Sequence, residues 1–137
     1  MERSSMVDKR LIREWLEKAD EDFGFASSVM ETSRYYAHIC FHYQQAAEKY
    51  LKAFIVTHEL EFRKSHELLE LLNICKAKEQ TFSMIEDECN FLNRFYIDTR
   101  YPVHWPASYG KEDALKAQRA AKKIAETVLL LTSDIFK

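Results

Sequence analysis

The fold of this chain is decided by the segment Ala37-His38-Ile39-Cys40-Phe41-His42-Tyr43-Gln44-Gln45-Ala46-Ala47-Glu48-Lys49-Tyr50-Leu51-Lys52-Ala53-Phe54. Apolar residues recur in and just before it at alternating steps of four and three, which gives one face of an α-helix a continuous apolar surface. They are Tyr36, Cys40, Tyr43, Ala47, Tyr50 and Phe54. A polar stripe repeats this spacing on a roughly opposite face and consists of His38, His42, Gln45, Lys49 and Lys52. The segment predicts a long helix with an aromatic seam toward a core and a polar column toward solvent.

The same spacing extends outward from this segment and predicts an all-α fold. The expected helices are a first capped by Asp8 and ending near Met30, a second from about Tyr35 to His58, a third capped by Ser65, a fourth opened by a capping box of Ser83 and Glu86, and a fifth from about Lys111. The link between the first two is short, so these helices must pack antiparallel. We therefore expect an antiparallel, up-and-down bundle of about five helices.

Length, charge and cysteine content narrow the class of protein. The chain of 137 residues is long enough for one core, so we expect a single helical domain over residues 1–137. The net charge is −2, so any role in nucleic-acid binding must come from a local basic patch. Cys40, Cys75 and Cys89 each fall within an apolar helical pattern, which suits free, buried thiols in a reducing cytoplasm. No apolar run of membrane-spanning length is present, and we expect no contact with a membrane.

Four segments resemble the HEPN domain family. The run 41–53 is similar to the hallmark segment of that family, and the resemblance continues through residues 15–20, 64–68 and 100–102 in the same order. HEPN domains are helical modules associated with nucleotide binding. The Arg100-Tyr101-Pro102 form is similar to small stand-alone HEPN proteins of bacteria and archaea. Those proteins are often encoded beside a minimal nucleotidyltransferase, and the pair resembles a split enzyme or a toxin–antitoxin couple.

Two lysines on the polar stripe form the first candidate phosphate site. Lys49 and Lys52 are three residues apart, so both ammonium groups can approach a single phosphate. His42 and Gln45 continue the stripe and place hydrogen-bonding groups beside the two cations. The alternative is a solvated helix face whose charges are neutralised by neighbours such as Glu48. The sequence leaves both interpretations open.

A second candidate phosphate site lies at the start of the third predicted helix. Lys64 and His66 flank the expected N-cap Ser65, and a helix N-terminus favours anions through its free N–H groups and its macrodipole. The same residues are also ordinary for the start of a helix. His38 and His42 stand one turn apart, as in a two-histidine metal site, but Ile39 replaces the glutamate of the protease motif. We expect no metal and no cofactor.

The segment after the fourth predicted helix holds the candidate catalytic pair, Arg100 and His104. Ribonuclease members of the HEPN family carry an Arg followed, after four to six residues, by a His. In that arrangement the Arg would stabilise charge on the phosphate and the His would act as general acid or base. Here only three residues separate Arg100 from His104, and one of them is Pro102. The family motif is therefore not met.

Three functions follow from these candidates. The first is a HEPN protein that binds a nucleotide or an RNA phosphate and acts with an adjacent-gene nucleotidyltransferase. The second is an RNA endonuclease toxin that uses Arg100 and His104. The third is a helical subunit that completes the active site of a partner and binds no ligand itself. Aromatic residues expected off the core, Phe41, Tyr35 and Tyr109, predict a two-fold symmetric homodimer.

Overall fold

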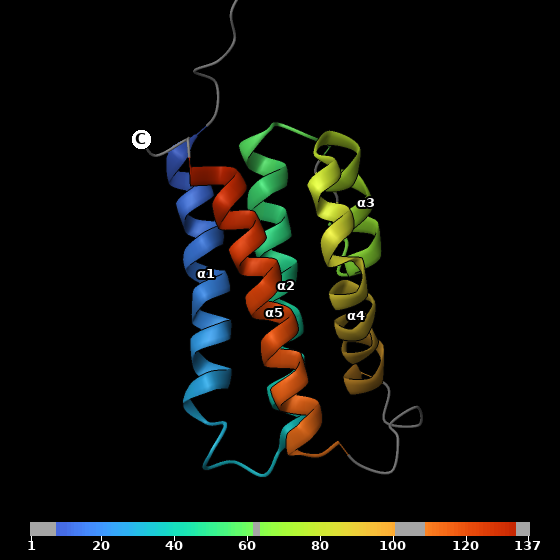
Figure 1. Ribbon diagram of the computed structural model, residues 1–137. Helices are drawn as coiled ribbons and strands as arrows, with labels where there is room; N and C mark the ends of the chain where they lie inside the picture. The colour runs from blue at the N-terminus through green and yellow to red at the C-terminus, as the bar shows by residue number, and fades with distance from the viewer. Residues whose placement is uncertain (1–7, 62–63, 101–108, 134–137) are drawn as a thin grey trace, which may run out of the picture.

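The computed structural model describes residues 8–61, 64–100 and 109–133, and the side chains of all of these except 97–100. Five α-helices and one 3₁₀ helix fill the described ranges. They are α1 (Lys9–Ser28), α2 (Tyr36–Thr57), α3 (Leu68–Lys78), η2 (Gln80–Ile85), α4 (Glu86–Arg100) and α5 (Lys111–Thr132). In Figure 1, α1 runs down the bundle, α2 runs up, α4 runs down and α5 runs up. The predicted antiparallel all-α bundle is confirmed.

The helix α2 is the centre of the bundle. It contacts α1, α3, α4 and α5, and most of its residues are buried, including polar ones such as Gln44 and Glu48. The predicted aromatic seam is confirmed, since Cys40, Tyr43 and Phe54 are buried in the main core. Because other helices surround α2, its polar stripe faces neighbours as well as solvent.

The starts of α1 and α5 follow from local sequence. Asp8 caps α1, and its carboxylate accepts the N–H of Arg10 at 2.9 Å. The backbone N–H of Gly110 donates to Asp113 at 2.9 Å across the start of α5. Such contacts satisfy N–H groups that a helix start leaves unpaired. The predicted starts of these two helices are confirmed.

The start of α3 differs from the prediction. Ser65 does not cap the helix, because its hydroxyl accepts the N–H of Glu67 at 3.1 Å in the preceding turn. The helix begins at Leu68, whose N–H donates to the side chain of Asn93 at 2.9 Å. Asn93 lies on α4, so a neighbouring helix supplies the cap that the sequence assigned to Ser65.

The start of α4 also differs from the prediction. Ser83 lies inside η2 and forms no capping box with Glu86. Instead the carboxylate of Glu79 accepts from the N–H and the hydroxyl of Thr81, at 3.3 and 2.7 Å. A 3₁₀ turn therefore precedes α4 and continues directly into it.

Buried thiols complete the core. Cys40, Cys75 and Cys89 are free and buried, as the sequence predicts. Burial is the main cause that raises the pKa values of Cys40 and Cys89 to about 12, so both thiols stay protonated. None of the described helices is long and apolar enough to cross a bilayer.

Candidate functional site

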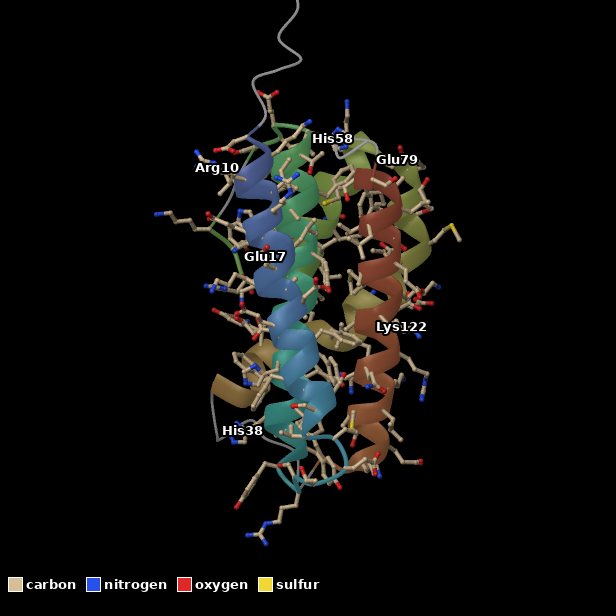
Figure 2. The ribbon with its side chains drawn as sticks, turned by 90° about the vertical axis from the view of Figure 1, so that its left-hand side faces the viewer. Arg10, Glu17, His38, His58, Glu79 and Lys122 are labelled. Carbon is tan, nitrogen blue, oxygen red and sulfur yellow. The ribbon has the colours of Figure 1, made fainter. Side chains whose placement is uncertain are left out.

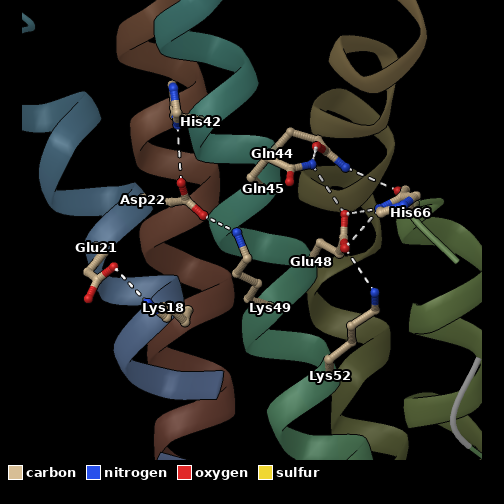
Figure 3. Close-up of polar contacts among 10 residues, drawn as sticks. All are labelled: Lys18, Glu21, Asp22, His42, Gln44, Gln45, Glu48, Lys49, Lys52 and His66. Carbon is tan, nitrogen blue, oxygen red and sulfur yellow. Dashed lines mark hydrogen bonds and ion pairs between the residues drawn. The ribbon is translucent and has the colours of Figure 1, made fainter. Parts of the chain in front are cut away.

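Two polar clusters lie along the side of α2 that faces away from α5. Figure 3 shows them in one view, with α1 on the left and α3 and α4 on the right. Each cluster joins one carboxylate to one lysine and one histidine. We call them the Asp22 cluster, made of Asp22, His42 and Lys49, and the Glu48 cluster, made of Glu48, Lys52 and His66.

The Asp22 cluster connects α1 to α2. The Nδ1 atom of His42 lies 3.1 Å from one carboxylate oxygen of Asp22, and the Lys49 ammonium group donates to the other oxygen. Burial raises the pKa of the Asp22 carboxyl, but the hydrogen bonds from His42 and Lys49 outweigh burial, and the pKa lies below its ordinary value. Phe25 contacts the edge of the His42 ring, with 4.8 Å between ring centroids. Lys49 is therefore held by an internal carboxylate.

The Glu48 cluster connects α2 to the segment before α3. The Lys52 ammonium group donates to Glu48 at 2.9 Å, and both side chains are about 95% buried. The Nδ1 atom of His66 lies 3.1 and 3.0 Å from the two oxygens of the same carboxylate. Gln45 donates to Glu48 at 3.3 Å and to Gln44 at 2.8 Å. Three side chains, those of Gln45, Lys52 and His66, thus fix the position of one buried carboxylate.

The ring of His66 is held at its Nδ1 atom and on one face. It stacks on Tyr96 of α4 with 5.3 Å between centroids, and Gln44 donates to its backbone carbonyl at 3.1 Å. The His66 side chain is nevertheless 43% exposed. Among the described residues, none hydrogen-bonds to its Nε2 atom. Lys64, two residues earlier, is exposed.

The structure brings together part of the predicted site and corrects one member. His42 and Lys49 meet in the Asp22 cluster, while Gln45, Lys52 and His66 meet in the Glu48 cluster. The prediction that Lys52 faces solvent is wrong. Its ammonium group is buried against Glu48 and lies 5.6 Å from the centre of the Trp15 ring on α1. A lysine in this position packs its stem and contacts an aromatic ring, so it does not present a free charge.

The candidate catalytic pair lies largely outside the described residues. His104 is outside the described ranges, and for Arg100 only the backbone is described. Arg100 is the last residue of α4 and follows Tyr96 by four residues, so its backbone lies one turn beyond the ring that stacks on His66.

Two residues that complete the clusters, Asp22 and Tyr96, were not predicted from the sequence, and Glu48 was named only as a neighbour that neutralises charge. Asp22 of α1 contacts His42 of α2, and Tyr96 of α4 stacks on His66. Spacing within one helix does not predict contacts between helices. Glu48 could have been assigned, because a glutamate four residues before a lysine forms a favourable pair on one helix. No group of three or more His, Cys, Asp or Glu side chains within the described residues is arranged to hold a metal ion.

Comparisons with known proteins identify the family. The HEPN domain profile matches residues 12–131, so the chain belongs to the HEPN domain family. The fold resembles the crystal structure of an archaeal HEPN homologue, with a TM-score of 0.69 and 24% sequence identity over 85% of this chain and 93% of that chain. A search of curated proteins found no match.

Proposed function

We propose that this HEPN protein binds the phosphate of a nucleotide or of RNA at the Glu48 cluster. In this proposal it is a single-domain, cytoplasmic homodimer that acts with an adjacent-gene minimal nucleotidyltransferase, with a toxin–antitoxin pair as one setting. The observation that carries the proposal is the His66 ring. Its Nδ1 atom is held by a buried carboxylate and its face is held by Tyr96, while the side chain is 43% exposed and no described residue hydrogen-bonds to its Nε2 atom.

The charge balance of the cluster favours an anion at His66. Lys52 neutralises Glu48 inside the bundle, so a proton on His66 adds a positive charge that no further carboxylate of the cluster cancels. The contact with Glu48 also fixes which ring nitrogen faces outward, as in other carboxylate–histidine pairs. When the ring is protonated, Nε2 donates to a phosphate oxygen. The exposed Lys64 supplies a second cation close by in the chain.

The Asp22 cluster repeats this arrangement on the side of α2 that faces α1. Lys49 neutralises Asp22, and His42 is the member whose protonation adds charge. Its side chain is 34% exposed. A strand of RNA lying along α2 would meet both histidines, whereas a mononucleotide would meet one. Lys49 and Lys52 then act by balancing the carboxylates, and His42, Gln45, Lys64 and His66 are the members left to face a ligand.

The test compares two histidine variants. We expect His66→Ala to weaken the binding of a short single-stranded RNA by about tenfold or more at pH 6, because a charge-assisted hydrogen bond contributes about 1.5–3 kcal/mol. His58→Ala is the matched control, since His58 also contacts an aromatic ring, Phe54, but lies outside both clusters. Fluorescence anisotropy with labelled RNA measures both affinities. Equal affinities for wild type and His66→Ala would contradict the proposal.

RNA cleavage is the second candidate function. The observation that favours it is the end of α4, where Arg100 follows the residue that stacks on His66 by one turn. In this hypothesis Arg100 steadies charge on the phosphate and His104 transfers a proton. Metal-independent cleavage that leaves cyclic phosphate ends, and that disappears in His104→Ala, would establish it. The absence of cleavage by a protein that binds RNA would favour the binding function.

A further inference from the structure

The first half of α1 carries apolar side chains on a face that the core does not use. The residues that form the core face of this helix are Ile12, Ala19 and Ala26. Leu11 and Trp15 are four residues apart and share a different face, where Leu11 is 41% exposed and Trp15 is half-buried. Figure 2 shows α1 in front of α2, with Glu17 labelled on α1. This face of α1 is therefore partly apolar without being covered by another described helix.

The face contains a hollow of about 280 Å³. Its volume is slightly below the range of sites that enclose a whole small molecule, so it suits an inserted side chain. The described residues that line it are Leu11, Glu14, Trp15, Glu17, Lys18 and Glu21. None of these residues belongs to the Asp22 cluster or to the Glu48 cluster. The hollow is therefore a separate feature from the proposed phosphate site.

Trp15 gives the hollow a fixed wall. The Lys52 ammonium group lies 5.6 Å from the centre of the Trp15 ring, and Glu48 accepts from the same ammonium group at 2.9 Å. Lys52 and Glu48 are both buried, so the support of the ring is internal to the bundle. A ring that is fixed before binding loses little conformational freedom when a partner packs against it. Trp residues are also enriched among those that contribute most to the binding energy of interfaces.

Three carboxylates give the rim of the hollow a negative charge. Glu14 and Glu17 are exposed, and neither makes an ion pair or hydrogen bond with another described residue. Glu21 pairs with Lys18 at 3.6 Å, as Figure 3 shows, but the two side chains are 69% and 65% exposed, and such a pair contributes little. The rim therefore repels the phosphates of nucleic acids and of lipid headgroups, and it attracts a cationic partner.

The spacing of the acidic side chains suits a helical partner. Glu14, Glu17 and Glu21 recur at steps of three and four, which places them in a row along about two turns of α1. A second helix that lies alongside has the same spacing, so its lysines or arginines meet these carboxylates while its apolar residues meet Leu11 and Trp15. The side chains of an extended peptide alternate with a period of two residues and do not match this row.

We infer that this face of α1 binds a basic amphipathic helix of another protein. One apolar side chain of that helix fills the hollow beside Trp15, and its cations contact the glutamates of the rim. The face extends about 15 Å along α1 from Leu11 to Glu21, so we expect a small interface and a transient complex. The inference does not rest on RNA binding, because the two surfaces share no residue.

The experiment titrates the full chain with a fluorescently labelled synthetic peptide of about 18 residues, or about five helical turns. The basic peptide has leucines along one face, lysines beside them and alanines elsewhere, and the comparison peptide has glutamates in place of the lysines. Fluorescence anisotropy at low salt measures affinity, and the indole N–H signal of Trp15 in two-dimensional NMR shows where the peptide binds. We expect the basic peptide to shift this signal and to bind about tenfold or more tightly than the acidic peptide.

Variants of exposed residues locate the binding surface. Leu11→Ser and Glu14→Gln/Glu17→Gln should each weaken the binding of the basic peptide by about fivefold, because they remove apolar or charged contacts at the protein surface. The control Asp87→Asn/Glu126→Gln removes the same charge from exposed positions on α4 and α5 and should bind the peptide as wild type does. Circular dichroism should show unchanged helicity in all three variants.

Three results would overturn the inference: equal affinities for the two peptides, an affinity unchanged within about twofold in Glu14→Gln/Glu17→Gln, or an equal loss in the control. If RNA rather than the basic peptide shifts the Trp15 signal, the face binds nucleic acid and the inference is wrong. If Leu11→Ser converts a dimer to a monomer on sedimentation, a second copy of the chain covers the face and the inference is also wrong.

The His66→Ala variant separates this inference from the proposed function. If His66→Ala loses RNA binding and keeps the affinity of wild type for the basic peptide, both are supported. If wild type binds RNA but not the basic peptide, this inference alone fails. If wild type binds the basic peptide at Trp15 but not RNA, the proposed function alone fails.

Discussion

At the scale of single residues, the two clusters show how α2 accommodates Lys49 and Lys52, each paired with a carboxylate. A buried lysine is tolerated when a carboxylate and further hydrogen bonds compensate its desolvation. Lys52 has such a partner in Glu48, and Glu48 has further partners in His66 and Gln45. The cluster side chains that are most exposed are therefore the two histidines.

A double-mutant cycle tests this view of the Glu48 cluster. We expect Lys52→Met to lower the free energy of unfolding by about 3–5 kcal/mol, because it leaves the buried Glu48 carboxylate without its cation. The double variant Glu48→Gln/Lys52→Met should recover most of that loss, since a neutral amide needs no counter-ion. Urea unfolding at pH 7.5 measures both. If Lys52→Met is as stable as wild type, Lys52 is not needed to balance the charge of Glu48.

The Asp22 carboxyl predicts a dependence of stability on pH. Its pKa in the folded chain lies below the ordinary value of 3.8, so the pair with Lys49 and His42 stabilises the fold above that pH. This stabilisation is lost as the pH falls through the lowered pKa. The difference in unfolding free energy between wild type and Asp22→Asn should therefore be present above about pH 3.8 and shrink as the pH falls below it.

Glu21→Gln is the control for the pH experiment. Glu21 pairs with Lys18 on the exposed face of α1, with 69% of its side chain exposed. Such surface pairs contribute little to stability. If the stability difference between wild type and Asp22→Asn is as small and as independent of pH as the one for Glu21→Gln, the Asp22 pair does not stabilise the fold.

At the scale of helices, the cap of α3 joins the start of α3 to the middle of α4. Leu68 begins α3, and its N–H is satisfied by Asn93 of α4. We expect Asn93→Ala to lower the free energy of unfolding by about 1 kcal/mol, the usual cost of losing a cap. Asn90→Ala is the matched control, because Asn90 is exposed and donates only to Glu86 within its own helix. Thermal unfolding of both variants measures the difference. If Asn93→Ala melts at the same temperature as Asn90→Ala, the Asn93 cap does not stabilise the fold.

The positions of the α-helices could be predicted from the sequence, and the contacts between the helices could not. Alternating four-three spacing predicted all five α-helices because burial of one face repeats within each segment. The capping signals at Ser65 and Ser83 were wrong, since the contacts there come from Asn93 and Glu79. The spacing also placed Lys52 at the surface, although a helix at the centre of a bundle is covered on more than one face. The sequence of α2 does not show that Trp15 lies over Lys52 or that His66 contacts Glu48.

At the scale of the whole molecule, aromatic side chains gather near the turn between α1 and α2. Phe25 is 49% exposed and Tyr35 is 58% exposed. Tyr109, which the sequence placed at the surface, instead packs against Phe95 with 5.0 Å between centroids. Phe41 is half-buried beside His42. The exposed pair therefore carries the prediction of a homodimer.

Sedimentation at micromolar concentration tests the homodimer. We expect wild type to sediment as a dimer and Phe25→Ser/Tyr35→Ser to shift toward monomer, because the variant removes apolar surface from the predicted interface. Met84→Ser is the control, since Met84 is 66% exposed on η2, away from that turn. A wild-type chain that sediments only as a monomer would rule the homodimer out.

The central position of α2 also sets how the molecule opens. Each outer helix covers only part of α2, so the departure of any one of them leaves the α2 amide groups shielded by the rest. We therefore expect exchange of those amides with solvent deuterium to require loss of the whole structure, and exchange in the 3₁₀ turn of η2 to need only local opening. On this expectation, the helix that holds both polar clusters is the last part of the protein to unfold.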